Sequence, residues 1–111
     1  MTVKFVFALM VAVSLFSGCG ADPGEKVYTS NGCPQCHGPD GSGTGKGPPL
    51  RDLLALWTEQ SLQTYLRGPS AYIKQDTRLQ ALKEQYKTVM PQFAMTDADR
   101  QKLVAYLLSK D

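Results

Sequence analysis

One short run, residues 32–38, constrains this chain more than any other feature of its sequence. It reads Gly-Cys-Pro-Gln-Cys-His-Gly and so contains the pattern Cys-x-x-Cys-His. This pattern is the attachment signature of c-type haem: two thiols add across the vinyl groups of a porphyrin, and the imidazole that follows reaches the iron. His37 is the only histidine of the chain. The motif therefore predicts one covalent haem c, attached through Cys33 and Cys36, with His37 as an iron ligand.

Two other kinds of site use a Cys-x-x-Cys pair, and we keep both as minor alternatives. A structural zinc site needs four ligands, normally supplied by a second pair, and the chain has no second pair. A thioredoxin-type redox pair lies in a βαβ unit, whereas the sequence around Cys33 and Cys36 is glycine-rich and helical in pattern. Haem attachment is the favoured interpretation.

The beginning of the chain is typical of an export signal. Lys4 supplies a positive start, an apolar run covers residues 5–16, and small residues follow. A helix needs about 20 apolar residues to cross a bilayer, and this run is shorter. We therefore expect residues 1–18 to be a signal peptide rather than a permanent transmembrane anchor.

The end of this signal, Leu-Phe-Ser-Gly-Cys over residues 15–19, resembles the lipobox of bacterial lipoproteins. In that motif the cysteine, here Cys19, is acylated and becomes the first mature residue. Phe16 departs from the usual leucine, and ordinary cleavage near Ala21 is the alternative. Acylation of Cys19 would anchor the protein in a membrane leaflet.

A single small domain remains, and we expect it to cover residues 24–111, with residues 19–23 as a tether. The chain has 12 basic and 10 acidic residues, which does not supply the concentrated basic face that nucleic-acid binding needs. A domain of this size buries only a small apolar core, to which a porphyrin would add. We expect an exported monomer in the periplasm or at the outer face of the cell membrane.

The apolar spacing of the domain predicts helices and no strands. Helical patterns cover residues 24–36, 59–67 and 76–87, and a last helix begins after Thr96 as N-cap. Glycines alternate with proline and polar residues over residues 38–49, a composition that excludes a regular element. The predicted fold is all-α, with four to five short helices wrapped around one haem.

An iron bound by His37 has a second axial position, for which two methionines of the domain are candidates. A methionine thioether there raises the reduction potential relative to two histidines. Met90 precedes Pro91, which restricts Met90 to extended geometry and favours a rigid loop. Met95 lies just before the expected N-cap Thr96 and is expected to pack against the core. We predict Met90 as the second ligand.

These motifs occur in the same order along the chain as in a known family, and the match covers nearly all of the mature chain. The chain resembles a class I, monohaem c-type cytochrome of bacteria. The matching segments are residues 24–28, 32–38, 47–50, 57–73, 90–93 and 103–107. The resemblance implies electron transfer with redox partner proteins, which include membrane respiratory complexes.

The resemblance also implies roles for residues around the haem. Pro48 matches a proline whose carbonyl accepts a hydrogen bond from the iron-bound imidazole. Trp57 matches an indole that donates to a buried haem propionate, and Tyr65 matches a tyrosine whose hydroxyl reaches the methionine sulfur. Tyr106 matches an aromatic residue that packs near Gly24. Plain core packing is the alternative for Trp57 and Tyr65.

One segment departs from the shorter members of the family. Residues 74–89 separate the part that matches Tyr72 and Ile73 from the predicted axial methionine. This segment includes the predicted helix 76–87 and, together with Arg67, carries an excess of positive charge. Such a charge would steer an acidic partner, and an ordinary solvated helix face is the alternative.

These expectations leave two classes of function. The first is a monohaem electron carrier of the cell envelope, which is not an enzyme. The second is a ligand-binding or peroxidatic haem domain with a labile methionine, for which no histidine remains once His37 is used. A haem subunit of a larger membrane oxidase or reductase shares the chemistry of the first class and differs in its partner.

Overall fold

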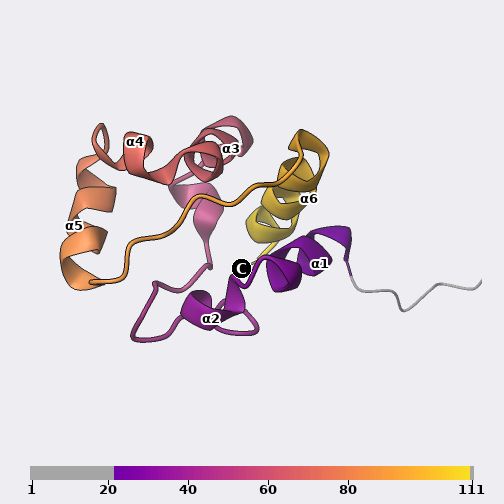
Figure 1. The fold of residues 1–111 in the computed structure, drawn as a ribbon, viewed down its shortest axis with the longest axis horizontal. Helices are drawn as coiled ribbons and strands as arrows, with labels where there is room; N and C mark the ends of the chain where they lie inside the picture. Colours follow the sequence, from indigo (N-terminus) through magenta and orange to yellow (C-terminus); the bar gives the residue numbers. More distant parts are fainter. Residues whose placement is uncertain (1–21, 111) are drawn as a thin grey trace, which may run out of the picture.

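The computed structural model describes residues 22–110, which form helices joined by loops (Figure 1). The helices in chain order are α1 (Pro23–Ser30), α2 (Pro34–His37), the 3₁₀ helix η1 (Leu53–Ala55), α3 (Glu59–Arg67), α4 (Pro69–Ile73), α5 (Thr77–Gln85) and α6 (Asp97–Leu108). Within this part of the chain, the only β pairing is an isolated bridge between Thr44 and Gly47. The predicted all-α fold is confirmed.

The core lies where α1 and α6 cross, and α3 packs against α6 (Figure 1). Tyr28 of α1 and Leu103 and Val104 of α6 are almost fully buried. Gly24 permits the crossing, because a Cβ at this position would lie 2.1 Å from the carbonyl oxygen of Lys102. A residue without a side chain lets the two backbones approach this closely.

Gly24→Ala is expected to lower the free energy of unfolding by about 3 kcal/mol, because the added methyl group forces α1 and α6 apart. Gly45→Ala is the matched control, since a Cβ at Gly45 meets nothing within 4 Å. We expect this control to change the free energy of unfolding by less than about 0.5 kcal/mol. Denaturant unfolding of the haem-loaded protein measures both values. An equally small loss of unfolding free energy in both variants would show that the helix crossing does not depend on Gly24.

The helix predicted over residues 24–36 forms as two pieces, α1 and α2. Gly32 interrupts it with a left-handed φ of +76°, a conformation that glycine adopts without strain. Pro34 then opens α2 at a position where its missing N–H costs nothing. The break places Cys33 at the N-cap of α2 and Cys36 inside the helix.

The remaining helices match the sequence pattern except at two places. The predicted helix over residues 59–67 is α3, and the side chain of Thr96 caps α6 by accepting the Asp99 amide. The helix predicted over residues 76–87 ends earlier, because Tyr86 adopts extended backbone geometry. α4 is additional to the predicted set: Pro69 occupies the first turn of a new helix.

No helix among residues 22–110 is long and apolar enough to cross a membrane. The expected signal peptide over residues 1–18 and the expected acylation site Cys19 lie outside the described residues. Most of the expected tether, residues 19–23, lies outside them as well. The division of the chain into signal, tether and domain therefore remains a prediction.

Candidate functional site

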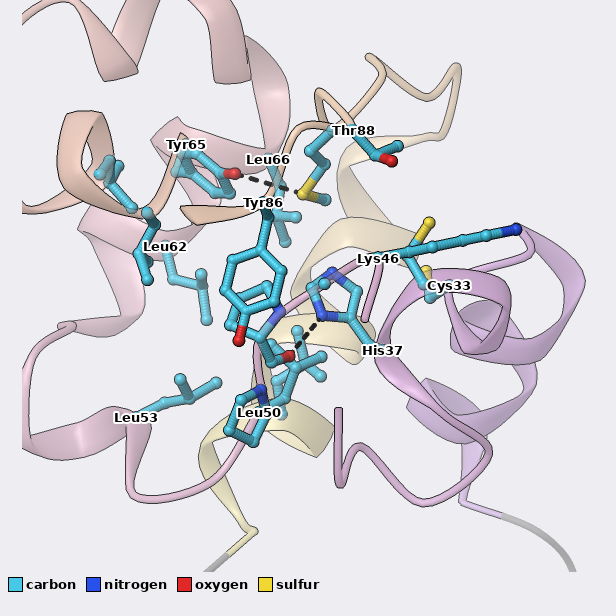
Figure 2. Close-up of a pocket in the computed structure, with 18 of the residues that line it drawn as sticks. Cys33, His37, Lys46, Leu50, Leu53, Leu62, Tyr65, Leu66, Tyr86 and Thr88 are labelled. Carbon is cyan, nitrogen blue, oxygen red and sulfur yellow. Dashed lines mark hydrogen bonds between the residues drawn. The ribbon is translucent and has the colours of Figure 1, made fainter. Parts of the chain in front are cut away.

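A cavity of about 860 Å³ lies among α2, η1, α3, α5 and the loops that follow α2 and α5. This volume falls within the roughly 300–1,000 Å³ that is typical of pockets for small organic molecules. Much of the lining is apolar, and Figure 2 shows Leu50, Leu53, Leu62 and Leu66 among the side chains around it. Such a lining favours an apolar occupant over water.

The three predicted attachment residues, Cys33, Cys36 and His37, all line this cavity. His37 Nδ1 lies 2.8 Å from the carbonyl oxygen of Pro48 (Figure 2). Because a carbonyl oxygen only accepts, Nδ1 donates the proton and Nε2 keeps its lone pair for a metal. Burial lowers the pKa of His37, so the imidazole is neutral, which is the form that binds iron.

The glycine-rich loop after α2 holds Pro48 beside the imidazole of His37. The Thr44 hydroxyl donates to the carbonyl oxygen of Cys36 at 2.6 Å. Gly47 packs directly on α2, where a Cβ would come within 2.9 Å of the same carbonyl oxygen. The glycines that exclude a regular element thus let the loop pack closely against the attachment motif.

Tyr28 connects the core to the attachment motif, a role that the sequence pattern does not distinguish from plain core packing. Its hydroxyl donates to the carbonyl oxygen of Gly38 at 2.5 Å. Burial raises the pKa of Tyr28 to about 12, so the hydroxyl remains protonated and donates at all ordinary pH values. The bond fixes the end of α2 against α1.

Met90 and Tyr65 line the cavity as well, and Figure 2 shows Tyr65 on a different side of it from His37. The Tyr65 hydroxyl donates to Met90 Sδ at 3.3 Å, and burial raises the pKa of Tyr65, which keeps the donor protonated. Met95 lies elsewhere: it lines a separate shallow pocket and packs against the core. The geometry favours Met90 as the thioether that faces the cavity.

Arg100 of α6 holds the residues just before that helix, and its sequence pattern does not mark it. Its side chain is only 8% exposed and pairs with Asp97. It also donates to the carbonyl oxygen of Met95 at 3.2 Å. Arg67 of α3 reaches the same Asp97 carboxylate at 3.7 Å. These contacts join Met95 to α6 and, through Asp97, join α6 to α3.

Trp57 belongs to an aromatic cluster at the cavity. It is 9% exposed, and its ring centroid lies 5.1 Å from that of Tyr65 and 5.6 Å from that of Tyr72. The guanidinium of Arg78 lies over the indole, 4.6 Å from its centroid. Trp57 therefore contributes to the core and also lines the cavity.

The alternative sites for the Cys-x-x-Cys pair find no support among residues 22–110. No group of three or more His, Cys, Asp and Glu side chains that could hold a metal ion occurs there, so a zinc site lacks its other ligands. No strand flanks Cys33 or Cys36 in that range, and so the βαβ setting of a thioredoxin-type pair is missing. The thiols are not joined in a disulfide.

Comparison with known families agrees with this geometry. The model of the family "Cytochrome c" matches residues 21–111. The chain belongs to the cytochrome c family. Membership implies one covalently bound haem c and a role in electron transfer. The cytochrome's own residues fit that group, since two thiols, a neutral imidazole and a thioether all reach one largely apolar cavity.

Among curated proteins, the cytochrome is similar to a protein named cytochrome c oxidase subunit 2 from Alkalihalophilus pseudofirmus. The two are 32% identical over 98 residues, which cover 80% of this chain and 25% of that protein. The cytochrome thus spans about a quarter of this relative's length. No solved structure gives a significant match.

Tyr65→Phe is expected to lower the reduction potential of the cytochrome by up to about 40 mV. The hydrogen bond from Tyr65 to the Met90 sulfur is worth about 1 kcal/mol. If Met90 binds the iron, losing this bond makes the sulfur a stronger electron donor and favours the ferric state. The free energy is converted at about 59 mV per tenfold change for one electron. Tyr72→Phe is the control, because Tyr72 contacts Tyr65 in the same cluster. A potentiometric titration measures both, and equal shifts would contradict a specific bond from Tyr65 to the sulfur.

Proposed function

We propose that the cytochrome is a one-electron carrier whose haem iron is held by His37 and Met90. The observation that carries the proposal is that both side chains reach one cavity and are each held by a partner. Pro48 accepts from His37, and Tyr65 donates to Met90. When bound, the haem supplies the redox chemistry, and the protein supplies ligation, burial and orientation.

The composition of the cavity supports electron transfer over ligand binding or peroxide chemistry. With His37 and Met90 both holding the iron, no iron position would be left for an exogenous molecule. His37 is the only histidine in the chain, so no second imidazole can assist proton transfer. Burial raises the pKa of Tyr65, so its hydroxyl stays protonated and is not available as a general base.

We further propose that the carrier works in the cell envelope, tethered through Cys19. The sequence supports this location by its export-type start and by the small residues before that cysteine. Acyl chains on Cys19 would confine the haem domain to the membrane surface. Its redox partners would then include membrane respiratory complexes.

The similarity to cytochrome c oxidase subunit 2 favours a second candidate, the haem-bearing subunit of a membrane oxidase. This candidate uses the same haem and the same ligands and differs in its permanent partners. Affinity capture of the protein from detergent-solubilised membranes of its host separates the two. A free carrier is recovered alone, whereas a subunit is recovered with oxidase chains in fixed stoichiometry.

Carbon monoxide binding tests directly whether Met90 occupies the second protein-ligand position of the iron. When the ferrous protein is mixed with carbon monoxide near neutral pH, the proposal expects no spectral change within minutes, because Met90 occupies the sixth position. Rapid and complete formation of a carbon monoxide adduct would overturn the proposal in favour of a ligand-binding haem domain.

A further inference from the structure

The segment that carries Met90, residues 87–95, is held in place by few contacts, and we call it the methionine loop. It crosses the molecule as an irregular coil between α5 and α6 (Figure 1). Most of its residues are exposed. Within residues 22–110, the backbone of the methionine loop neither donates nor accepts a backbone–backbone hydrogen bond. Secondary structure therefore does not fix the position of Met90.

Two side chains from other parts of the domain donate hydrogen bonds to the methionine loop. The Tyr65 hydroxyl donates to Met90 Sδ at 3.3 Å. Arg100 Nη2 donates to the carbonyl oxygen of Met95 at 3.2 Å, at the end of the loop next to α6. The side chains of Met90 and Met95 also pack against the core. Among the described residues, Arg100 is thus the only group that holds the backbone of the loop by a hydrogen bond.

The guanidinium of Arg100 is itself fixed in place. Its side chain is 8% exposed and pairs with Asp97, which lies three residues earlier on α6. The same carboxylate lies 3.7 Å from Arg67 of α3, so the guanidinium is fixed relative to two helices. Its Nε is buried and makes no hydrogen bond within residues 22–110, and a buried donor without a partner lowers stability. This cost favours a positioning role for Arg100 over a purely stabilising one.

We propose that Arg100 is a positioning residue for the iron ligand: by fixing the Met95 backbone, it limits how often Met90 leaves the iron. Met90 can leave only if the methionine loop moves, and a loop that is fixed at one end has fewer conformations to move into. Pro91, with its fixed φ angle, stiffens the part of the loop between the two methionines. The effect should be largest in the ferric protein, because a thioether favours the ferrous state. The proposal rests on the proposed ligation of the iron by Met90.

The rate at which imidazole binds to the ferric, haem-loaded protein tests the proposal. Imidazole can take the sixth position of the iron only after Met90 has left it. At high imidazole concentration the observed rate therefore levels off at the rate of methionine dissociation, which stopped-flow absorption measures. Arg100→Gln, with a shorter and uncharged side chain, should raise this limiting rate about tenfold, the change expected for loss of a charge-assisted hydrogen bond.

Three further variants separate a positioning role from a structural one. Arg67→Gln removes a charge beside the same carboxylate but leaves the bond to Met95, so the limiting rate should not change. Gly24→Ala weakens the crossing of α1 and α6 and should lower stability without raising the rate. Asp97→Asn removes the partner of Arg100 at a position that is 78% exposed, so it should fold and raise the rate by a smaller factor.

The limiting rates of these variants decide the proposal. An unchanged rate in Arg100→Gln would overturn it, and so would an equal increase in Arg67→Gln or Gly24→Ala. If Arg100→Gln does not fold, Asp97→Asn takes its place, and an unchanged rate in that variant has the same consequence.

The ferric spectrum and a protease separate this proposal from the iron ligation. If the near-infrared sulfur-to-iron band is missing from the wild-type protein, the proposed methionine ligation fails. Digestion of the folded, haem-loaded protein with a lysine-specific protease still decides whether Arg100 holds the methionine loop. Cleavage after Lys87, whose side chain is 83% exposed, should be faster in Arg100→Gln than in Arg67→Gln. Equal rates of cleavage in these two variants would contradict a specific hold of Arg100 on the loop.

Discussion

Met90→Ala should abolish the near-infrared sulfur-to-iron band of the ferric cytochrome and lower its reduction potential by on the order of 0.1 V or more. Axial ligands set haem potentials over a range of about 0.8 V, and a thioether favours the ferrous state. The ferrous variant should also bind carbon monoxide rapidly, since the sixth position becomes open. Absorption spectroscopy and potentiometry of the purified protein measure all three changes.

Met95→Ala is the matched control for this prediction. Met95 packs against the core and lines a shallow pocket apart from the cavity, so its removal should cost stability, about 2 kcal/mol, and leave the band in place. A band that survives in Met90→Ala and disappears in Met95→Ala would reverse the assignment of the ligand.

Cys19→Ala should move the cytochrome from the membrane fraction to the soluble fraction of its host. Each buried CH₂ of an acyl chain contributes about 0.8 kcal/mol to membrane binding, so the loss of the chains should release nearly all of the protein. Haem staining of fractions separated by ultracentrifugation measures the distribution. Phe16→Leu, which restores the usual lipobox leucine, is the control and should remain bound.

The mass of the mature wild-type protein from its native host checks the same proposal without a variant. It reports the haem, the cleavage site and the acyl group together. A mature chain that begins near Ala21 without acyl mass would contradict the proposed tether, and so would a Cys19→Ala protein that stays in the membrane fraction.

The cofactor and several residues that line its cavity could be predicted because their chemistry is local in the sequence. The two thiols and His37 lie within five consecutive residues, and Met90 is marked by the proline that follows it. The structure places all of them, with Pro48, Trp57 and Tyr65, around one cavity. Helical periodicity likewise predicted α3 and the start of α6. These helix starts are also local signals, because a capping residue is a sequence neighbour of the helix that it caps.

The features that sequence analysis missed depend on contacts between distant segments. Arg78 and Arg100 have the sequence pattern of surface charges on amphipathic helices, and only the packing of α5 and α6 shelters them. The acceptor for Tyr28 is the carbonyl oxygen of Gly38, which lies at the C-cap of α2, ten residues along the chain. Pro69 is ambiguous by nature, because a proline that ends one helix can begin the next.

A potentiometric titration near neutral pH, followed by absorption spectra of both oxidation states, tests the central claim most directly. The account predicts a single reversible one-electron wave, with low-spin spectra in the ferric and the ferrous protein and the sulfur-to-iron band in the ferric state. A high-spin spectrum in either state would show an open iron site and would contradict electron transfer through a haem closed by His37 and Met90.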